Sequence, residues 1–145
     1  MRRGFTLVEL LLVLAIIGVV SAVSIPTFVR SIRGNRLRAA LRTVVMAGKY
    51  ARSMAVLEQE RKTLTFNLAA GEVSVGNEIK RSLDRVKIER VILEDTNEEF
   101  TDSACLIVYE SNGLCTPYTV TITDQYGASM SVEVDALSSA KTVER

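Results

Sequence analysis

Residues 4–29 form a stretch of 26 residues with a single charged side chain, that of Glu9. From Leu10 to Ile25 the chain reads LLLVLAIIGVVSAVSI and carries no charge. A helix needs about 20 apolar residues to cross the hydrocarbon layer of a membrane. At 1.5 Å per residue, a helix over residues 5–25 is about 31 Å long, which matches the thickness of that layer. We therefore predict a membrane-spanning helical segment over residues 5–29.

Glu9 argues against the two plainest explanations of this stretch, a cleaved signal peptide and a simple anchor. A signal peptide has an apolar core of about 7–15 residues after a basic region, whereas this run begins at residue 5 and is longer. A carboxylate inside an apolar helix costs a few kcal/mol on insertion scales, so it indicates a function. No basic side chain of the span can pair with it. A free α-amino group could pair with the Glu9 carboxylate if the chain were cut a few residues upstream.

The residues around Glu9 form a recognisable motif. Residues 4–9 read GFTLVE, and the apolar run that follows extends to Pro26. This resembles the class III leader of type IV prepilins and type II secretion pseudopilins. The resemblance implies a leader of residues 1–4, cut by a prepilin peptidase between Gly4 and Phe5, and N-methylation of Phe5. It also implies that Glu9 neutralises the amino terminus of a neighbouring subunit during assembly.

The distribution of arginines conflicts with the topology that the leader implies. Only Arg2 and Arg3 precede the span, whereas five arginines follow it within residues 30–42. A positive-inside count would place the long part of the chain in the cytoplasm. We give the leader motif more weight because it is far more specific than a charge count. An uncleaved bitopic protein with a cytoplasmic head remains an alternative.

Beyond the span, residues 30–60 are predicted to continue the helix as its amphipathic half. Pro26 removes one backbone donor and predicts a kink rather than an end. Small and apolar residues recur at helical spacing, which suits packing against a sheet: Leu37, Ala40, Leu41, Val44, Ala47, Gly48, Ala51 and Ala55. A second stripe is basic and consists of Arg38, Arg42, Lys49 and Arg52. Its side chains suit a solvated face, acidic lipid headgroups, DNA phosphates, or an acidic neighbouring subunit.

From residue 61 the period changes from that of a helix to that of a strand, and residues 61–145 are predicted to form a β-rich head. Alternating or apolar runs predict strands over residues 63–68, 73–75, 86–93, 104–109, 118–123 and 130–134. The last two runs flank a turn at residues 124–127 and read as an antiparallel hairpin. Residues 94–102 hold five acidic side chains and are expected to form an exposed loop.

Composition excludes several functional classes. The chain has no histidine, which removes the Ser-His-Asp and Cys-His arrangements and every zinc site that needs imidazole. We therefore expect no enzyme, no cofactor, no metal site and no small-molecule substrate. The two cysteines, Cys105 and Cys115, enclose a turn and are either a disulfide in an oxidising compartment or two buried thiols. Net charge is +7 over residues 30–62 and −7 over residues 63–145, so we do not expect nucleic acid as a partner of the acidic head.

The predicted order, one long helix followed by antiparallel strands, resembles that of the H-type minor pseudopilins of type II secretion. This is the group of general secretion pathway protein H and FimT-like proteins. Residues 37–41 (LRAAL), 50–55 (YARSMA) and 62–66 (KTLTF) carry this part of the resemblance. It implies an α+β, pilin-like fold in which a long N-terminal helix, half transmembrane and half amphipathic, packs on a small antiparallel β-sheet head. It also implies a subunit of the bacterial inner membrane with a periplasmic head. Its partners would be other pseudopilins in a filament or tip complex, the prepilin peptidase and inner-membrane lipid. A type IV minor pilin for DNA uptake or adhesion is the alternative of the same fold.

Overall fold

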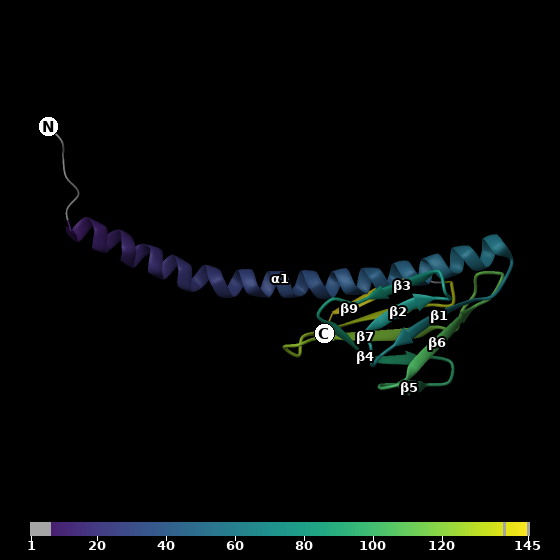
Figure 1. Cartoon of the computed structure of the whole chain (residues 1–145). Helices are drawn as coiled ribbons and strands as arrows, with labels where there is room; N and C mark the ends of the chain where they lie inside the picture. Colours follow the sequence, from purple (N-terminus) through teal and green to yellow (C-terminus); the bar gives the residue numbers. More distant parts are fainter. Residues whose placement is uncertain (1–6, 138, 145) are drawn as a thin grey trace. The chain divides into compact units, whose positions relative to one another are not determined.

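The computed structural model consists of one long helix followed by strands (Figure 1). It describes residues 7–137 and 139–144, and for residues 23–33 and 142–144 it describes the backbone alone. Helix α1 covers Leu7–Glu58. The described strands are β1 (Lys62–Asn67), β2 (Glu72–Val75), β3 (Ile79–Ser82), β4 (Val86–Leu93), β5 (Glu98–Phe100), β6 (Ala104–Tyr109), β7 (Tyr118–Asp124), β8 (Ser129–Val134) and β9 (Ala140–Glu144). The predicted α+β class, with a long N-terminal helix followed by antiparallel strands, is confirmed.

The chain divides into two compact units at a point inside α1. The first unit is Met1–Gly34 and the second is Asn35–Arg145. The second unit, called the head unit below, therefore contains the residues of α1 from Asn35 to Glu58 as well as the strands. The amphipathic half of the helix is part of the same compact body as the sheets.

The strands of the head unit form two antiparallel sheets. One has the order β3-β2-β1-β6 and the other the order β5-β4-β7-β8-β9. The predicted hairpin is confirmed as β7 and β8, in which Val120 pairs with Val132 and Ile122 with Met130. β4 carries a bulge between Ile88 and Arg90 where it pairs with β7.

Three edge strands, β3, β5 and β9, depart from the sequence expectations. Residues 94–102 were expected to form a loop, but Glu98–Phe100 pairs with the end of β4 as β5. β3 and β9 lie in segments for which no strand was predicted. β3 has an intermediate-to-exposed pattern without alternation, and it forms because Glu72–Val75 offers a pairing edge. Pairing, rather than a local hydrophobic pattern, produces such edge strands.

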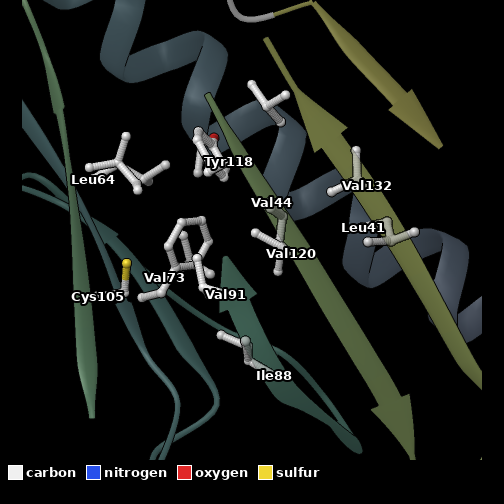
Figure 2. Packing of buried hydrophobic residues seen from close by; sticks show 14 of the residues in the cluster. Leu41, Val44, Leu64, Val73, Ile88, Val91, Cys105, Tyr118, Val120 and Val132 are labelled. Atoms are coloured by element: carbon white, nitrogen blue, oxygen red, sulfur yellow. The ribbon is translucent and has the colours of Figure 1, made fainter. Parts of the chain in front are cut away.

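The core of the head unit lies between the two sheets and the inner face of α1 (Figure 2). The predicted small apolar stripe of the helix is confirmed as this inner face, since Val44, Ala51 and Ala55 are fully buried. In Figure 2, Leu41 and Val44 of the helix face Val120 and Val132 of the β7–β8 hairpin. Small side chains at these positions let the helix backbone approach the sheet closely.

Helix α1 ends at Glu58 because the next residue adopts a left-handed backbone conformation. Gln59 has a φ of 56° and occupies the position where helices often end in this way. Its side-chain amide donates a hydrogen bond to the carbonyl of Val56, at 2.7 Å, and so satisfies a carbonyl of the last turn. Pro26 lies within the helical backbone. The kink expected at Pro26 stays a prediction.

Candidate functional site

The first described part of α1, residues 7–22, exposes apolar side chains on all sides, and we call it the stem segment. Eleven large apolar side chains of the segment are between 45% and 75% exposed: Leu7, Val8, Leu10, Leu11, Leu12, Val13, Leu14, Ile16, Ile17, Val19 and Val20. Successive helical residues differ by about 100°, so these positions surround the helix. An apolar surface this continuous is covered by lipid or by other helices in a working protein. The stem segment is therefore the leading candidate for a site of assembly or anchoring.

Glu9 is the acidic residue of the first turn of α1. A carboxylate in a first turn interacts favourably with the partial positive charge of the helix N-terminus. Its side chain is exposed, as are those of its neighbours Val8 and Leu10. The predicted cleavage site at Gly4 and Phe5 and the predicted N-methylation of Phe5 lie outside the described residues. The assembly role of Glu9 stays a prediction.

The residues that the structure describes include no helix with both the length and the hydropathy expected of a membrane span.

The basic stripe lies on the outer side of the helix in the head unit. Arg38, Arg42 and Lys49 are exposed, as expected. They line one side of an open groove of about 580 Å³ whose other lining residues are mainly apolar: Leu41, Val45, Met46, Met130 and Ala140. The groove thus combines cationic groups with an apolar floor, which suits an acidic and partly apolar ligand surface.

The fourth residue of the predicted stripe, Arg52, has a structural role instead. It is half-buried, and its Nη1 atom donates a hydrogen bond to the carbonyl of Leu137. Beside it, Gly113 adopts a φ of 81°, and a Cβ atom there would lie 2.9 Å from Cγ2 of Val56 and 3.1 Å from Nε of Arg52. The turn at Gly113 and the segment at Leu137 are therefore held against the last turns of α1.

The structure keeps the two cysteines apart, contrary to the disulfide considered from the sequence. Cys105 pairs with Phe66 inside the first sheet, whereas Cys115 forms an isolated bridge with Tyr109. Cys105 and Tyr109 are four residues apart on β6, or about 13 Å along the strand. A disulfide requires Cα atoms about 4.4–6.8 Å apart. Both cysteines are buried and carry thiols, in line with the other reading that we considered.

The surroundings of each thiol match a structural role. Burial raises the pKa of the Cys105 thiol to about 11, and the carboxylate of Glu98 adds to this shift. The Cys115 Sγ atom lies 3.6 Å from the carbonyl oxygen of Asp135, to which it donates a weak hydrogen bond. A raised pKa leaves little of the reactive thiolate at neutral pH, so Cys105 is suited to packing rather than to chemistry.

Sequence reasoning missed Arg81, because β3 and α1, which lie far apart in the chain, come together only in the folded head unit. Arg81 of β3 lies with Arg42 of α1 around a second groove of about 560 Å³. Within residues 7–137 and 139–144, no three side chains of His, Cys, Asp or Glu converge as a metal site would require. The missed residue is thus a surface cation rather than a metal ligand.

The comparisons with known proteins concern the N-terminus and the fold. Residues 1–25 match the family model described as the prokaryotic N-terminal methylation motif. Two solved structures of the minor pseudopilin EpsH from the type II secretion system of Vibrio cholerae are similar in fold. One has a TM-score of 0.62, 9% identity, and covers 76% of this chain and 97% of that one. The other has a TM-score of 0.56, 9% identity, and covers 75% of this chain and 97% of that one. No curated protein sequence matches the chain significantly.

Together, these findings confirm both parts of the resemblance drawn from the sequence. The methylation motif includes Gly4, Phe5 and Glu9, the residues on which the leader was recognised. The fold is the pilin-like α+β fold of the H-type minor pseudopilin. At 9% identity the structural similarity establishes the fold alone, and the biological role is argued separately below.

Proposed function

We propose that this chain is a minor pseudopilin of a type II secretion pseudopilus. It is a non-enzymatic subunit of the inner membrane that helps to export folded proteins. The observation that carries the proposal is the combination of a methylation motif at residues 1–25 with the fold of EpsH. The exposed stem segment supports it further, because a helix that is apolar on all sides needs lipid or neighbouring helices around it.

In the proposed mechanism, a prepilin peptidase removes residues 1–4 and leaves an N-methylated amino group at Phe5. The stem anchors the chain in the inner membrane with the head unit in the periplasm. During assembly the stem leaves the membrane and packs among the stems of other pseudopilins. Neighbouring helices then replace lipid around the apolar surface of the stem, so this surface stays buried throughout assembly.

Glu9 gives this packing a fixed register. Phe5 and Glu9 are four residues apart, or roughly 6 Å along a helix. If one stem is displaced by about a turn, the carboxylate of Glu9 meets the amino group of its neighbour. In an apolar environment this ion pair is stronger than in water, and an all-apolar stem without it could slide. The pair also removes the cost of a lone carboxylate in the membrane.

A deletion strain of the host tests the proposed role. Loss of secretion of a type II reporter substrate, restored by the wild-type gene, supports it. Loss of DNA uptake with intact secretion would overturn it in favour of a type IV minor pilin.

A second experiment measures the mass of a C-terminally tagged chain purified from host membranes. A start at methylated Phe5 supports the proposal, and a start at Met1 in cells with the peptidase would favour the uncleaved bitopic protein.

A further inference from the structure

One end of the head unit is basic. This end holds the first residues of the unit, which begins at Asn35. It is formed by the start of the Asn35–Glu58 part of α1, by the β3–β4 turn and by the β7–β8 turn. Arg36 of the helix lines a groove together with Leu83 and Asp84 of the β3–β4 turn. Val86, just after that turn, pairs with Asp124, where the β7–β8 turn begins. We call these three neighbouring segments the base of the head.

Cations outnumber carboxylates among the described side chains in and next to the base. The exposed cations are Arg36, Arg38, Arg42, Arg81, Arg85 and Lys87. The carboxylates nearby are Asp84, Asp124, Glu89 and Glu72, which pairs with Ser82 at the end of β3 and forms an ion pair with Lys80. Asp84 lies only loosely against Arg85, with an N–O distance of 4.0 Å. Asp124 accepts hydrogen bonds from the backbone N–H groups of Tyr126 and Ala128, at 2.8 and 2.9 Å, so it shapes the β7–β8 turn.

The opposite ends of the helix and strands carry many carboxylates. Glu94 lines a groove with Glu133, near the end of β8, and with Asp135, just after it, and the same groove also holds one cation, Lys141. At the end of α1, Glu58 pairs with Lys62, which also lies 3.6 Å from Glu78. The charge of the head unit is therefore divided along its length, with its basic part at the end where residue 35 enters.

The base also presents an aromatic side chain at its tip. Tyr126 lies in the turn between β7 and β8 and is 59% exposed. Tyrosine is enriched at membrane–water interfaces because its ring is apolar and its hydroxyl is polar. A basic surface with an exposed tyrosine is suited to an anionic lipid surface, where cations meet headgroups and the ring enters the interface.

Chain length places the base within reach of such a surface. If residues 5–29 span the membrane, the five residues 30–34 connect the span to Asn35. Five residues extend over at most about 17 Å, and over about 8 Å when helical. The start of the head unit therefore cannot move far from the headgroup layer, whatever its orientation. This step rests on the membrane anchor of the proposed function.

We propose that the base of the head docks on the anionic lipid surface of the inner membrane before assembly. Tyr126 enters the interface, and Arg36, Arg81, Arg85 and Lys87 contact lipid phosphates. The docking holds the unassembled subunit with its acidic end pointing away from the membrane. Joining the filament then requires release from the lipid headgroups.

The chain contains no tryptophan, so a single introduced tryptophan reports on one site. The full chain is reconstituted in phosphatidylcholine vesicles with or without about 30% phosphatidylglycerol, with quencher lipids brominated near the headgroup for the head-unit variants and deep in the acyl chain for the stem variant. Three single variants are compared: Tyr126→Trp at the base, Leu57→Trp at the far end of α1, and Leu14→Trp in the stem segment. Leu57 is 22 residues from Asn35, or about 33 Å along the helix.

Docking predicts at least about twofold stronger quenching of Tyr126→Trp in the anionic vesicles than in neutral ones, lost near 1 M salt because screening is then complete within about 3 Å. Leu57→Trp should stay unquenched in both. Adding Arg81→Gln and Lys87→Gln should clearly weaken the anionic effect, because it removes two of the four cations that contact phosphates. The charge-matched pair Arg61→Gln and Lys141→Gln should preserve it, because both residues lie outside the base.

Each contrary outcome has a distinct meaning. Suppose that Leu14→Trp is quenched, but that quenching of Tyr126→Trp is no stronger in anionic vesicles than in neutral ones. The docking proposal is then overturned, and the membrane anchor of the proposed function stands. If Leu57→Trp is quenched as strongly as Tyr126→Trp, the head adsorbs without orientation, and docking through the base is wrong. If Leu14→Trp is not quenched in any vesicle, the stem is outside the membrane, and both proposals fail.

Discussion

The phenolic oxygens of Tyr109 and Tyr118 lie 3.1 Å apart in the buried core, directly beneath Gly48 of α1. A Cβ atom on Gly48 would lie 2.9 Å from the first oxygen and 3.0 Å from the second. The two tyrosines come from different sheets, since Tyr109 ends β6 and Tyr118 begins β7. The glycine thus lets the helix approach a hydrogen-bonded pair that links both sheets.

We predict that Gly48→Ala destabilises the protein although alanine is the better helix former. The helix propensity gain is about 1 kcal/mol, whereas forcing a methyl group into a packed core costs about 1–3 kcal/mol. Urea denaturation should therefore give a lower unfolding midpoint. Gly34→Ala is the matched control, because a Cβ there meets nothing within 4 Å outside its own stretch of helix, and it should leave the midpoint unchanged or raise it.

A rescue experiment checks the cause. In the Gly48→Ala background, Tyr118→Phe removes one of the two oxygens that the new methyl group meets and should restore part of the lost stability. If Tyr118→Phe costs as much in this background as in the wild-type protein, the close approach at Gly48 is not the source of the loss.

The protein should lose stability as the pH rises above about 9. Burial raises the pKa of Tyr118 well above 10, with the Tyr109 hydroxyl as a further cause, and it raises the pKa of Cys105 from 9 to about 11. Both acids are neutral when protonated. Between pH 9 and 11 the unfolded chain therefore ionises its thiol while the folded chain keeps it protonated. Each such group lowers the free energy of unfolding by up to about 1.4 kcal/mol per pH unit.

Urea midpoints measured from pH 7 to 11 test this prediction. Cys105→Ala lowers stability at every pH because it leaves a cavity, but its decline between pH 9 and 11 should be shallower. An identical slope in the wild-type protein and in Cys105→Ala would contradict the assignment of this loss to the thiol.

Neither cysteine should form a disulfide with the other in the folded protein. Denatured protein should react with two equivalents of a thiol reagent without prior reduction, because the strand register keeps the Cα atoms of Cys105 and Cys115 apart. In the native protein at pH 8, Cys105 should react much more slowly than an ordinary thiol, since it is fully buried and its raised pKa leaves little thiolate. Protein from an oxidising compartment that needs a reductant before labelling would contradict this account.

The sequence predicted the parts of the fold that carry a local pattern. The helix face of Leu41 and Val44 and the β7–β8 hairpin both repeat apolar residues at the period of their element, and both are buried as expected. β3 and β5 have no such pattern: Ile79–Ser82 contains two cations, and Glu98–Phe100 lies in the acidic stretch. They are strands because a neighbouring strand offers its edge, which is a tertiary property.

The candidate sites divide in the same way. Glu9 could be found from the sequence, because a charge in an apolar run is a local anomaly. The base of the head could not, because Arg36, Arg81 and Tyr126 come from three segments that only the strand pairings bring to one end. The cysteines show the limit of spacing arguments. Cys105 and Cys115 are close in sequence, yet β6 carries the chain away from Cys105 before the turn brings Cys115 back beside Tyr109.

Processing should depend on the residue before the cleavage site. With prepilin peptidase present, the mature chain should begin at Phe5 and carry one added methyl group. Gly4→Phe should leave the leader attached, because the motif has glycine at this position and a bulky side chain would obstruct the peptidase. Intact-mass spectrometry distinguishes the two forms. A processed Gly4→Phe chain would show that the cut does not require Gly4.

The central claim, that the stem assembles through Glu9, is tested most directly by co-purification of the tagged chain with its partner pseudopilins. Glu9→Leu removes the carboxylate, so it should insert at least as well and still be cleaved at Phe5. Glu9→Asp keeps the charge but is one methylene shorter, and it should be partly defective. Leu14→Ile is the matched control for a change within the apolar surface and should assemble normally. The account predicts that Glu9→Leu is found in the membrane fraction, with a processed N-terminus, but not in the complex. Normal co-purification of Glu9→Leu would contradict it.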